Sequence, residues 1–395
     1  MKNEKLLLFI LAVIQFAHLL DFMIIMPLGA QFMEIFSISP QQFSLMVSSY
    51  ALSAFVMGIL SALYIDRFDR KQALLWINFG FAAGTLACAF VPNYYLFLAA
   101  RSLAGAFGGI LGALVLSIVA DVIPLERRAS AMGIVMTSFS VASVAGVPLG
   151  LYLAAEYSWR LPFIIISLLA FLLCGLIYWL LPAMRGHLSE DKQAVNPFRV
   201  IGNIFSDPNQ LRALIFTTIM MLGHFIIIPF IAPYMQLNIG FSDHDVTYIY
   251  LFGGITTAVL LPLFGRIADI HGHAKVFTIA SIFALVSIYG ITNLPPVPMF
   301  IALLVTSSYF IVASGRSVPA TTMVTAVVRP ESRGSFMSIR SSANEMALGL
   351  ASLLAGLIVV ENPDGSLGNY EYVGYIGIIM SIVAIILGRK LKTIA

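Results

Sequence analysis

Five ionisable residues stand inside long apolar runs of this 395-residue chain, namely Asp21, Arg101, Arg316, Arg340 and Glu345. A charged side chain in an apolar membrane interior is costly unless it is paired or hydrated, so such residues point to function. A carboxyl group in this setting can bind and release a proton, and a neighbouring arginine favours its charged form. We therefore predict that Asp21 and Glu345 are proton-binding groups.

Asp21 and Arg101 are expected at the same depth. Asp21 lies eight residues before Gly29, where the first apolar run ends, and Arg101 lies eight residues after Asn93, near the start of the fourth. With a helical rise of about 1.5 Å per residue, both would sit about 12 Å below the same surface and could pair. The alternative is a fixed structural pair that never exchanges a proton.

His18 precedes Asp21 by three residues and therefore shares its helix face. Its imidazole would add a second titratable group to a proton path. The alternative is a histidine that only packs between helices. We predict His18, Asp21 and Glu345 as the proton-coupling residues.

A second cluster is expected nearer the opposite surface. Glu345 lies twelve residues after Arg333, and Arg316 lies thirteen residues before Arg329. These spacings place Glu345 and Arg316 about 18 and 20 Å from the cytoplasmic surface, so the two side chains could form a second ion pair. Arg340 lies closer to the start of its apolar run. The alternative interpretation of Arg340 is that its long side chain extends to the membrane–water interface and places the charge there.

The elements that carry these residues are transmembrane helices. Hydrophobic residues make up 59% of the chain, charged residues 10%, and the mean hydropathy is +0.94. Each membrane-spanning helix needs about 20 apolar residues, whereas barrel strands alternate over about ten. We predict an all-α membrane protein with twelve transmembrane helices at 6–29, 41–65, 72–91, 94–120, 129–154, 161–181, 211–235, 245–267, 274–293, 298–325, 334–360 and 371–388.

The positive residues predict the orientation. If both termini are cytoplasmic, all but three of the 22 Lys and Arg residues fall in cytoplasmic segments or at their edges. The exceptions are Arg160, which falls outside, and Arg101 and Arg316, which lie within helices. The net charge of +3 therefore reflects topology, and no nucleic-acid surface is indicated.

The two sides of the polar stretch 182–210 repeat one another. Asp21-Phe-Met-Ile-Ile-Met-Pro27 corresponds to Gly223-His-Phe-Ile-Ile-Ile-Pro229, and Asp66 corresponds to Asp269. We predict two pseudo-symmetric six-helix bundles, 1–181 and 211–395, joined by a cytoplasmic linker at 182–210. Duplicated bundles of this kind enclose a site near the middle of the membrane and rock to expose it alternately, which predicts a transporter.

The segment Ala62-Leu-Tyr-Ile-Asp66-Arg67-Phe-Asp69-Arg70-Lys71 resembles the loop after helix 2 in the major facilitator superfamily, Gly-x-x-x-Asp-Arg-x-Gly-Arg-Lys/Arg. The resemblance covers essentially the whole chain. It implies that the loop aspartate braces the end of helix 2 against the start of helix 11. The implied gating residues are Asp66, Arg67, Arg70 and, in the second copy, Asp269.

Two further motifs resemble those of proton-coupled members. Arg101-Ser-Leu-Ala-Gly105-Ala-Phe-Gly108 resembles their Arg-x-x-x-Gly pattern, and Gly146-Val-Pro148-Leu-Gly150 resembles the helix 5 string of efflux antiporters. Pro148 removes a helical hydrogen bond, and the glycines allow a close helix contact, which we expect at the seam between the halves. The alternative is an ordinary packing kink with no bearing on direction.

The family resemblance implies a central cavity lined by helices 1, 4, 7 and 10. The candidate substrate residues are Phe22, Met26, Arg101, His224, Tyr309, Arg316 and Asn344. Aromatic and methionine side chains suit a broad, partly apolar substrate range. A substrate with hydroxyls or a carboxylate stays open through Arg101, Arg316, Asn344 and His224.

We predict a secondary active transporter that exports small amphiphilic compounds, drugs or sugars by proton antiport. The alternative is a proton symporter that imports a sugar or an organic acid. The sequence has no Gly-x-Ser-x-Gly, His-Glu-x-x-His or phosphate-loop motif, so we expect neither an enzyme nor a metal site. The expected partners are the substrate, protons and the lipid bilayer of a bacterial plasma membrane, with the monomer functional, no cofactor and the proton gradient as energy source.

Overall fold

The computed structural model describes residues 4–61, 64–185, 202, 204–328 and 333–392. Twelve helical stretches in these ranges are long and apolar enough to span a membrane, which confirms the predicted fold class. The observed bounds are close to the predicted ones because the lengths of the apolar runs set them. The last helix, for example, is Tyr370–Gly388 where 371–388 was predicted. The cytoplasmic placement of both termini stays a prediction.

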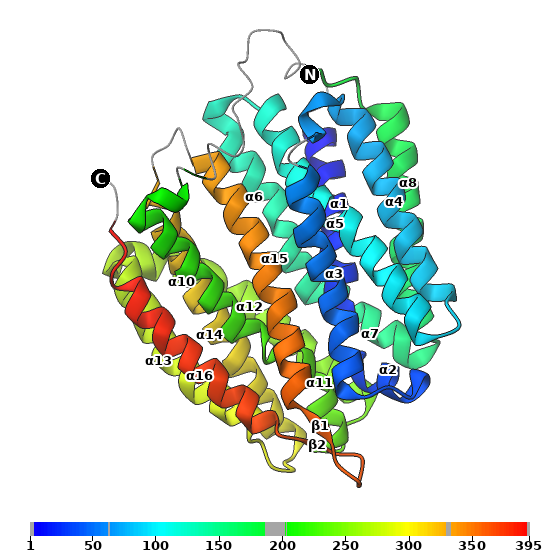
Figure 1. Ribbon diagram of the computed structural model, residues 1–395, viewed down its shortest axis with the longest axis vertical. Coiled ribbons are helices and arrows are strands. Elements are labelled where there is room, and N and C mark those ends of the chain that lie inside the picture. The colour runs from blue at the N-terminus through cyan, green and yellow to red at the C-terminus, as the bar shows by residue number, and fades with distance from the viewer. Residues whose placement is uncertain (1–3, 62–63, 186–201, 203, 329–332, 393–395) are drawn as a thin grey trace. The chain divides into compact units, whose positions relative to one another are not determined.

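The chain forms two compact units (Figure 1). Met1–Ile25 and Ser49–Pro197 make up the first unit, and Met26–Ser48 and Phe198–Ala395 make up the second. The predicted boundaries at 181 and 211 remain predictions, although the segment Met26–Ser48 groups with the second unit and not with the first. The predicted linker lies largely outside the described residues.

The helices of the first half of the chain follow the predicted order. They are α1 (Glu4–Ile24), α2 (Gly29–Phe36), α3 (Pro40–Ser61), the short η1 (Ile65–Arg67), α4 (Arg70–Phe90), α5 (Tyr94–Val122), α6 (Leu125–Val141), η2 (Ala142–Gly146), α7 (Val147–Glu156) and α8 (Arg160–Leu180). Within the first unit, α4 packs on α5 and α8, and α1 packs on α5, α6 and α8.

The second half repeats this pattern. Its elements are α10 (Pro208–Phe225), α11 (Ile228–Leu237), α12 (Asp243–His271), α13 (His273–Thr292), α14 (Met299–Thr325), α15 (Arg333–Ile358), the short strands β1 (Val360–Glu361) and β2 (Leu367–Gly368), and α16 (Tyr370–Gly388). Within the second unit, α14 packs on α12 and α13, and α10 packs on α15 and α16.

The first and seventh predicted helices are interrupted at corresponding points. The first ends at Ile24 and resumes at Gly29 as α2, and the seventh ends at Phe225 and resumes at Ile228. Pro27 and Pro229, which the repeat aligned, lie at these breaks because proline cannot donate the next helical hydrogen bond. The extension of the chain as α2 beyond residue 29 was not predicted.

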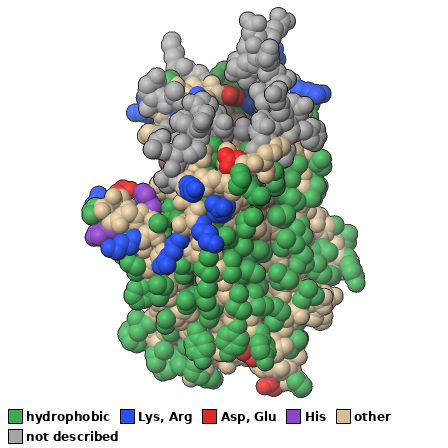
Figure 2. All heavy atoms as spheres, turned by 60° about the vertical axis from the view of Figure 1, so that its left-hand side comes forward, with side chains coloured by type: hydrophobic (Ala, Val, Ile, Leu, Met, Phe, Trp, Pro, Cys, Tyr) green, Lys and Arg blue, Asp and Glu red, His purple; other side chains and the backbone are tan. Residues whose placement is uncertain are grey.

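The outer surface of the second unit is strongly apolar. Ile282, Phe283 and Val286 of α13 and Ile379 and Ile382 of α16 are exposed. Figure 2 shows hydrophobic side chains covering a broad continuous area, with Lys and Arg gathered toward one end of it. Such a band is stable only against lipid, as expected for a membrane-spanning bundle.

Candidate functional site

The first unit contains the predicted ion pair between α1 and α5. Arg101 Nη1 donates to Asp21 Oδ2 at 2.9 Å and to the Asp21 carbonyl oxygen at 3.2 Å. Both side chains are fully buried. Arg101 Nε and Nη2 are also buried and make no hydrogen bond within the described residues. The pair is therefore sealed from solvent but only partly satisfied.

Tyr50 of α3 joins this pair to His18. The Arg101 guanidinium carbon lies 4.5 Å from the centre of the Tyr50 ring, and the Tyr50 hydroxyl lies 2.7 Å from His18 Nδ1. Phe22 packs on the same ring at 5.5 Å between ring centres. His18, Tyr50, Arg101 and Asp21, here called the Asp21 cluster, thus form one continuous polar chain. Tyr50 was missed because no sequence spacing reveals which residue of α3 faces α5.

Two glycines of α5 make room for this cluster. A Cβ atom at Gly105 would lie 2.6 Å from the Tyr50 Cα, and one at Gly108 would lie 2.8 Å from His18 Nδ1. Both distances are too short for real contacts, so only glycine fits at these positions. The Arg-x-x-x-Gly motif therefore brings Tyr50 and His18 close to the helix that carries Arg101.

Gly105→Ala is expected to lower the free energy of unfolding by about 1–3 kcal/mol, because the added methyl group forces α3 and α5 apart. Gly175→Ala in α8 is the matched control, since nothing lies within 4 Å of a Cβ there. That change is expected to leave stability unchanged or raise it by up to about 1 kcal/mol through helix propensity. Denaturation of the purified variants in detergent measures both changes in the free energy of unfolding. Equal changes in the two variants would show that the close contact of Gly105 with Tyr50 does not contribute to stability.

The helix 5 string also packs on the helix that carries Asp21. The chain forms one π-helical turn at Ala142–Gly146 directly before Pro148, whose missing amide donor accounts for the irregularity. A Cβ at Gly146 would lie 3.0 Å from Leu20, and one at Gly150 would lie 2.6 Å from Ile24, both residues of α1. The expected seam between the halves is therefore wrong for these glycines, whose close contacts are within the first unit.

The second unit holds another buried polar group, from α10, α14 and α16. Arg316 donates to Ser381 Oγ at 3.1 Å, and its Nη2 lies 3.2 Å from His224 Nδ1. The Tyr309 hydroxyl lies 3.0 Å from the same His224 nitrogen. Arg316, His224, Tyr309 and Ser381 are called the Arg316 cluster below. The first three were predicted, and Ser381 was not.

The predicted pair of Arg316 with Glu345 is not formed. The Arg316 guanidinium is bound to α10 and α16, whereas Glu345 lies on α15. Arg340 does not reach back to the interface, because its side chain is buried and donates to Thr321 Oγ1 at 3.0 Å. Depth along a helix does not reveal the direction in which a side chain points, so the pairing of these residues could not be predicted.

Within the described residues, no hydrogen bond joins two other predicted substrate residues, Asn344 and Met26, to either cluster. Asn344 is partly buried on α15, and its Oδ1 has no hydrogen-bond partner within the described residues. Met26 is buried at the turn between α1 and α2 and groups with the second unit. Their assignment to a substrate cavity stays a prediction.

The predicted gating loop is only partly described. Arg70 is buried and pairs with Asp121 at the end of α5, Nε to Oδ2, at 2.9 Å. Arg67 is exposed, and Asp269 Oδ1 lies 3.7 Å from His273 Nε2. The Asp66 side chain and those at the start of α15 lie outside the described residues, so the brace to helix 11 stays a prediction.

Asp69, which stands where the family loop has glycine, caps α4 and holds the chain after α8. Its carboxylate accepts hydrogen bonds from the Lys71 amide at 2.8 Å, the Met184 amide at 3.2 Å and Arg185 Nε at 3.0 Å. Burial alone would raise the pKa of Asp69, but these hydrogen bonds outweigh it and hold the pKa below its usual value. The ionised form therefore stabilises the fold.

Asp69→Asn is expected to lower the free energy of unfolding at neutral pH by about 1 kcal/mol, because asparagine can still cap α4 but lacks the charge that strengthens the hydrogen bonds from the Met184 amide and Arg185. Because the folded-state pKa is the lower one, the stabilisation is complete above the unfolded value of about 4 and is lost as the pH falls through the folded-state value. Thermal denaturation of both proteins across this range measures the difference. Asp364→Asn, which removes an exposed carboxylate whose hydrogen bonds among the described residues stay within its own turn, is the control. A wild-type advantage that persists unchanged at the lowest pH would contradict the assignment.

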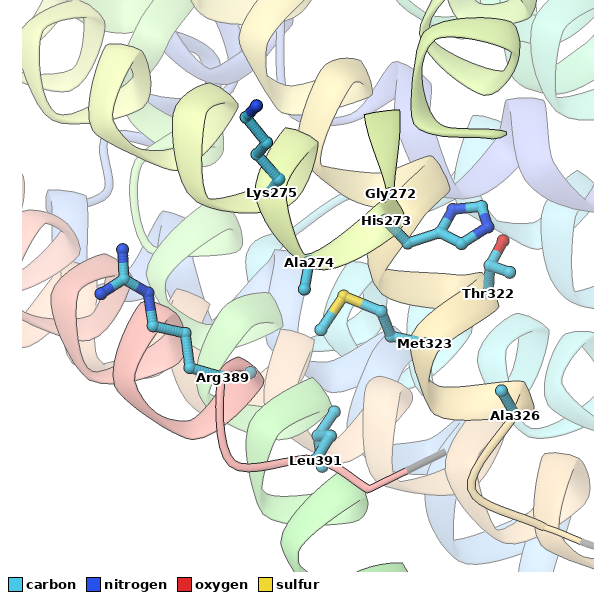
Figure 3. A pocket seen from close by; sticks show the side chains of 10 residues that line it. Gly272, His273, Ala274, Lys275, Thr322, Met323, Ala326, Arg389 and Leu391 are labelled. Carbon is cyan, nitrogen blue, oxygen red and sulfur yellow. The ribbon is translucent and has the colours of Figure 1, made fainter. Parts of the chain in front are cut away.

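A separate cavity of about 420 Å³ lies in the second unit, where α12 meets α13 and next to the ends of α14 and α16 (Figure 3). His273, Lys275, Thr322, Met323 and Arg389 are among its lining residues. None of the predicted substrate or proton-coupling residues lines it. The cavity is therefore distinct from both polar clusters.

Comparison with known proteins identifies the family. The family model described as Major Facilitator Superfamily matches residues 11–224 and 213–393. The uncharacterized MFS-type transporter YwfA of Bacillus subtilis (strain 168) is 27% identical over 371 residues, which cover 92% of this chain and 88% of that protein. The probable sugar efflux transporter of Mannheimia succiniciproducens is 26% identical over 253 residues, 63% of this chain and 62% of that protein.

A solved structure agrees with this assignment. The crystal structure of a D-xylose-proton symporter superposes with a TM-score of 0.81, covering 98% of this chain and 99% of that chain. At 16% identity this likeness shows the fold alone. Matches of the family model across both halves, together with twelve candidate spans, place the protein in the membrane as a multi-pass transporter of small molecules. The chain therefore belongs to the major facilitator superfamily.

Proposed function

We propose that this transporter is a proton-coupled antiporter that exports small amphiphilic compounds, drugs or sugars across the bacterial inner membrane. In this proposal the monomer carries the complete pathway, works by alternating access and draws its energy from the proton gradient. No cofactor takes part. The observation that carries the proposal is the sealed ion pair of Asp21 and Arg101.

Asp21 is suited to proton coupling because its charge is balanced by one partly satisfied arginine. When Asp21 binds a proton, the ion pair loses its attraction and Arg101 is left with few hydrogen bonds. His18, which reaches Arg101 through Tyr50, supplies a second titratable group. We propose that a proton on Asp21 and a bound substrate exclude one another. Glu345, which makes no ion pair within the described residues, is the second candidate.

Two findings favour export. The Gly146–Gly150 string, which resembles that of efflux antiporters, packs directly on α1, which carries Asp21. A change at α6, η2 or α7 would therefore reach the proposed proton site by direct contact. In addition, one relative that matches over 63% of this chain is named a probable sugar efflux transporter.

Transport in inverted membrane vesicles tests the proposal. With an inside-acid gradient, vesicles that contain the protein are expected to accumulate a fluorescent amphiphile or a labelled sugar and to release protons as they do so. Collapse of the gradient with an ionophore should stop the accumulation. If solute leaves the vesicles together with protons, the protein is an importing symporter. If solute moves regardless of the gradient, coupling is absent.

A further inference from the structure

Arg316 is a buried cation without a neutralising partner. Its side chain is 3% exposed, and its two terminal nitrogens bind Ser381 Oγ and His224 Nδ1. No carboxylate of the described residues forms an ion pair with it. These two hydrogen bonds to neutral groups use only two of the five N–H donors of a guanidinium and leave its charge uncompensated, which is costly in a membrane interior.

His224 does not change this charge. A guanidinium can only donate hydrogen bonds, so the nearby His224 Nδ1 must accept, and the ring carries its proton on the other nitrogen. The imidazole is then neutral. Tyr309 and Ser381 are also neutral, so the Arg316 cluster has a net charge of +1.

The first unit balances the same kind of charge internally. There, Asp21 pairs with Arg101, whereas the repeat places Gly223 where Asp21 stands. A Cβ atom at Gly223 would lie 2.8 Å from the Met380 Cβ, so α16 already occupies the space that a side chain would need. The described part of the second unit therefore keeps a buried cation but supplies no anion beside it.

An aromatic surface and an unused donor extend from Tyr309 of this cluster. The Tyr250 hydroxyl is buried and has no hydrogen-bond partner within the described residues. Its ring packs on Phe310 at 5.9 Å between ring centres, and Phe310 packs on Tyr309 at 5.8 Å. Aromatic faces suit an apolar or sugar-like body, and a free hydroxyl donor suits an anionic oxygen.

We propose that the Arg316 cluster binds the carboxylate of the transported solute, so that the substrates are organic acids. The planar guanidinium matches a carboxylate with two parallel hydrogen bonds. The bound anion neutralises the buried charge. The inference rests on the proposed export function for its role in transport, but the binding event itself requires no proton gradient.

Ligand binding to the purified full chain in detergent tests this inference. Two matched pairs of probes differ mainly in charge: phenylacetate with phenylacetamide, and glucuronate with glucose. At fixed pH and ionic strength, the carboxylates are expected to raise the melting temperature in a concentration-dependent way, whereas the neutral partners are not. Equal shifts within each pair, or no shift with any probe, would overturn the inference.

Substitutions of arginine residues test whether carboxylate binding depends on Arg316. Arg316→Gln is expected to weaken carboxylate binding at least about tenfold, the equivalent of 1.4 kcal/mol. Arg316→Lys keeps the positive charge but loses the planar guanidinium with its paired donors, so it should weaken carboxylate binding less. This variant replaces Arg316→Gln in the experiment if the Gln variant does not fold. Arg340→Gln, a change at another buried arginine of the same unit, should keep the wild-type affinity. Unchanged binding in both Arg316 variants, or an equal loss in Arg340→Gln, would overturn the inference.

Carboxylate binding at Arg316 and proton-driven export can be confirmed or contradicted independently of each other. Carboxylate-selective binding without gradient-driven export would support the Arg316 inference and contradict antiport. Proton-driven export of neutral solutes, without carboxylate selectivity, would support antiport and contradict the inference.

Discussion

Asp21→Asn is expected to reduce pH-gradient-driven accumulation in inverted vesicles to the level of vesicles that lack the protein. Asparagine keeps the shape of the side chain and an oxygen that can accept from Arg101 Nη1, but it cannot bind and release a proton. The conformational cycle would then proceed, if at all, without proton movement. Uptake of the labelled substrate and the accompanying pH change, recorded together, measure this loss.

Glu4→Gln provides the matched control for this experiment. Glu4 lies on the same helix and pairs with Arg127 at 3.0 Å, but that pair is exposed to solvent. Its loss should leave gradient-driven transport unchanged, because surface pairs contribute little. Full coupled transport by Asp21→Asn would show that another group, with Glu345 as the first candidate, carries the proton.

Arg101→Met is expected to lower the free energy of unfolding by about 3–5 kcal/mol, because it leaves the buried Asp21 charge without a partner. The double variant Asp21→Asn, Arg101→Met should recover most of this loss, since neither charge then remains. The coupling energy from the double-mutant cycle is therefore expected to be large, about 2 kcal/mol or more. Denaturation in mixed micelles measures the four stabilities.

The pair of Glu4 and Arg127 again supplies the comparison, with an expected coupling of about 0–1 kcal/mol. A coupling energy for Asp21 and Arg101 as small as that of the exposed pair would contradict their description as a sealed ion pair.

The sequence predicted those features that depend on length along a helix. The bounds of the spans follow from the apolar runs, and the meeting of Asp21 with Arg101 follows from equal depth, because helical rise is nearly constant. Internal repetition also aligned Pro27 with Pro229, where both helices are interrupted.

Features that depend on the rotation and packing of helices were not predictable. Glu345 and Arg316 have similar predicted depths, but Arg316 points toward α10 and α16, so they do not pair. Tyr50 and Ser381 gave no signal, because a single tyrosine or serine in a helix reveals nothing about the helix opposite. The glycines of α5, such as Gly105 and Gly108, did hint that another chain segment approaches this helix closely.

The number of protons released when substrate binds to the purified protein tests directly whether substrate and proton compete at Asp21. In weakly buffered detergent solution, we expect a transported solute to displace a proton from the wild-type protein, and we expect Asp21→Asn to bind the solute without proton release. Binding to the wild type with no proton release, or with proton uptake, would contradict competition at Asp21 and with it the antiport mechanism.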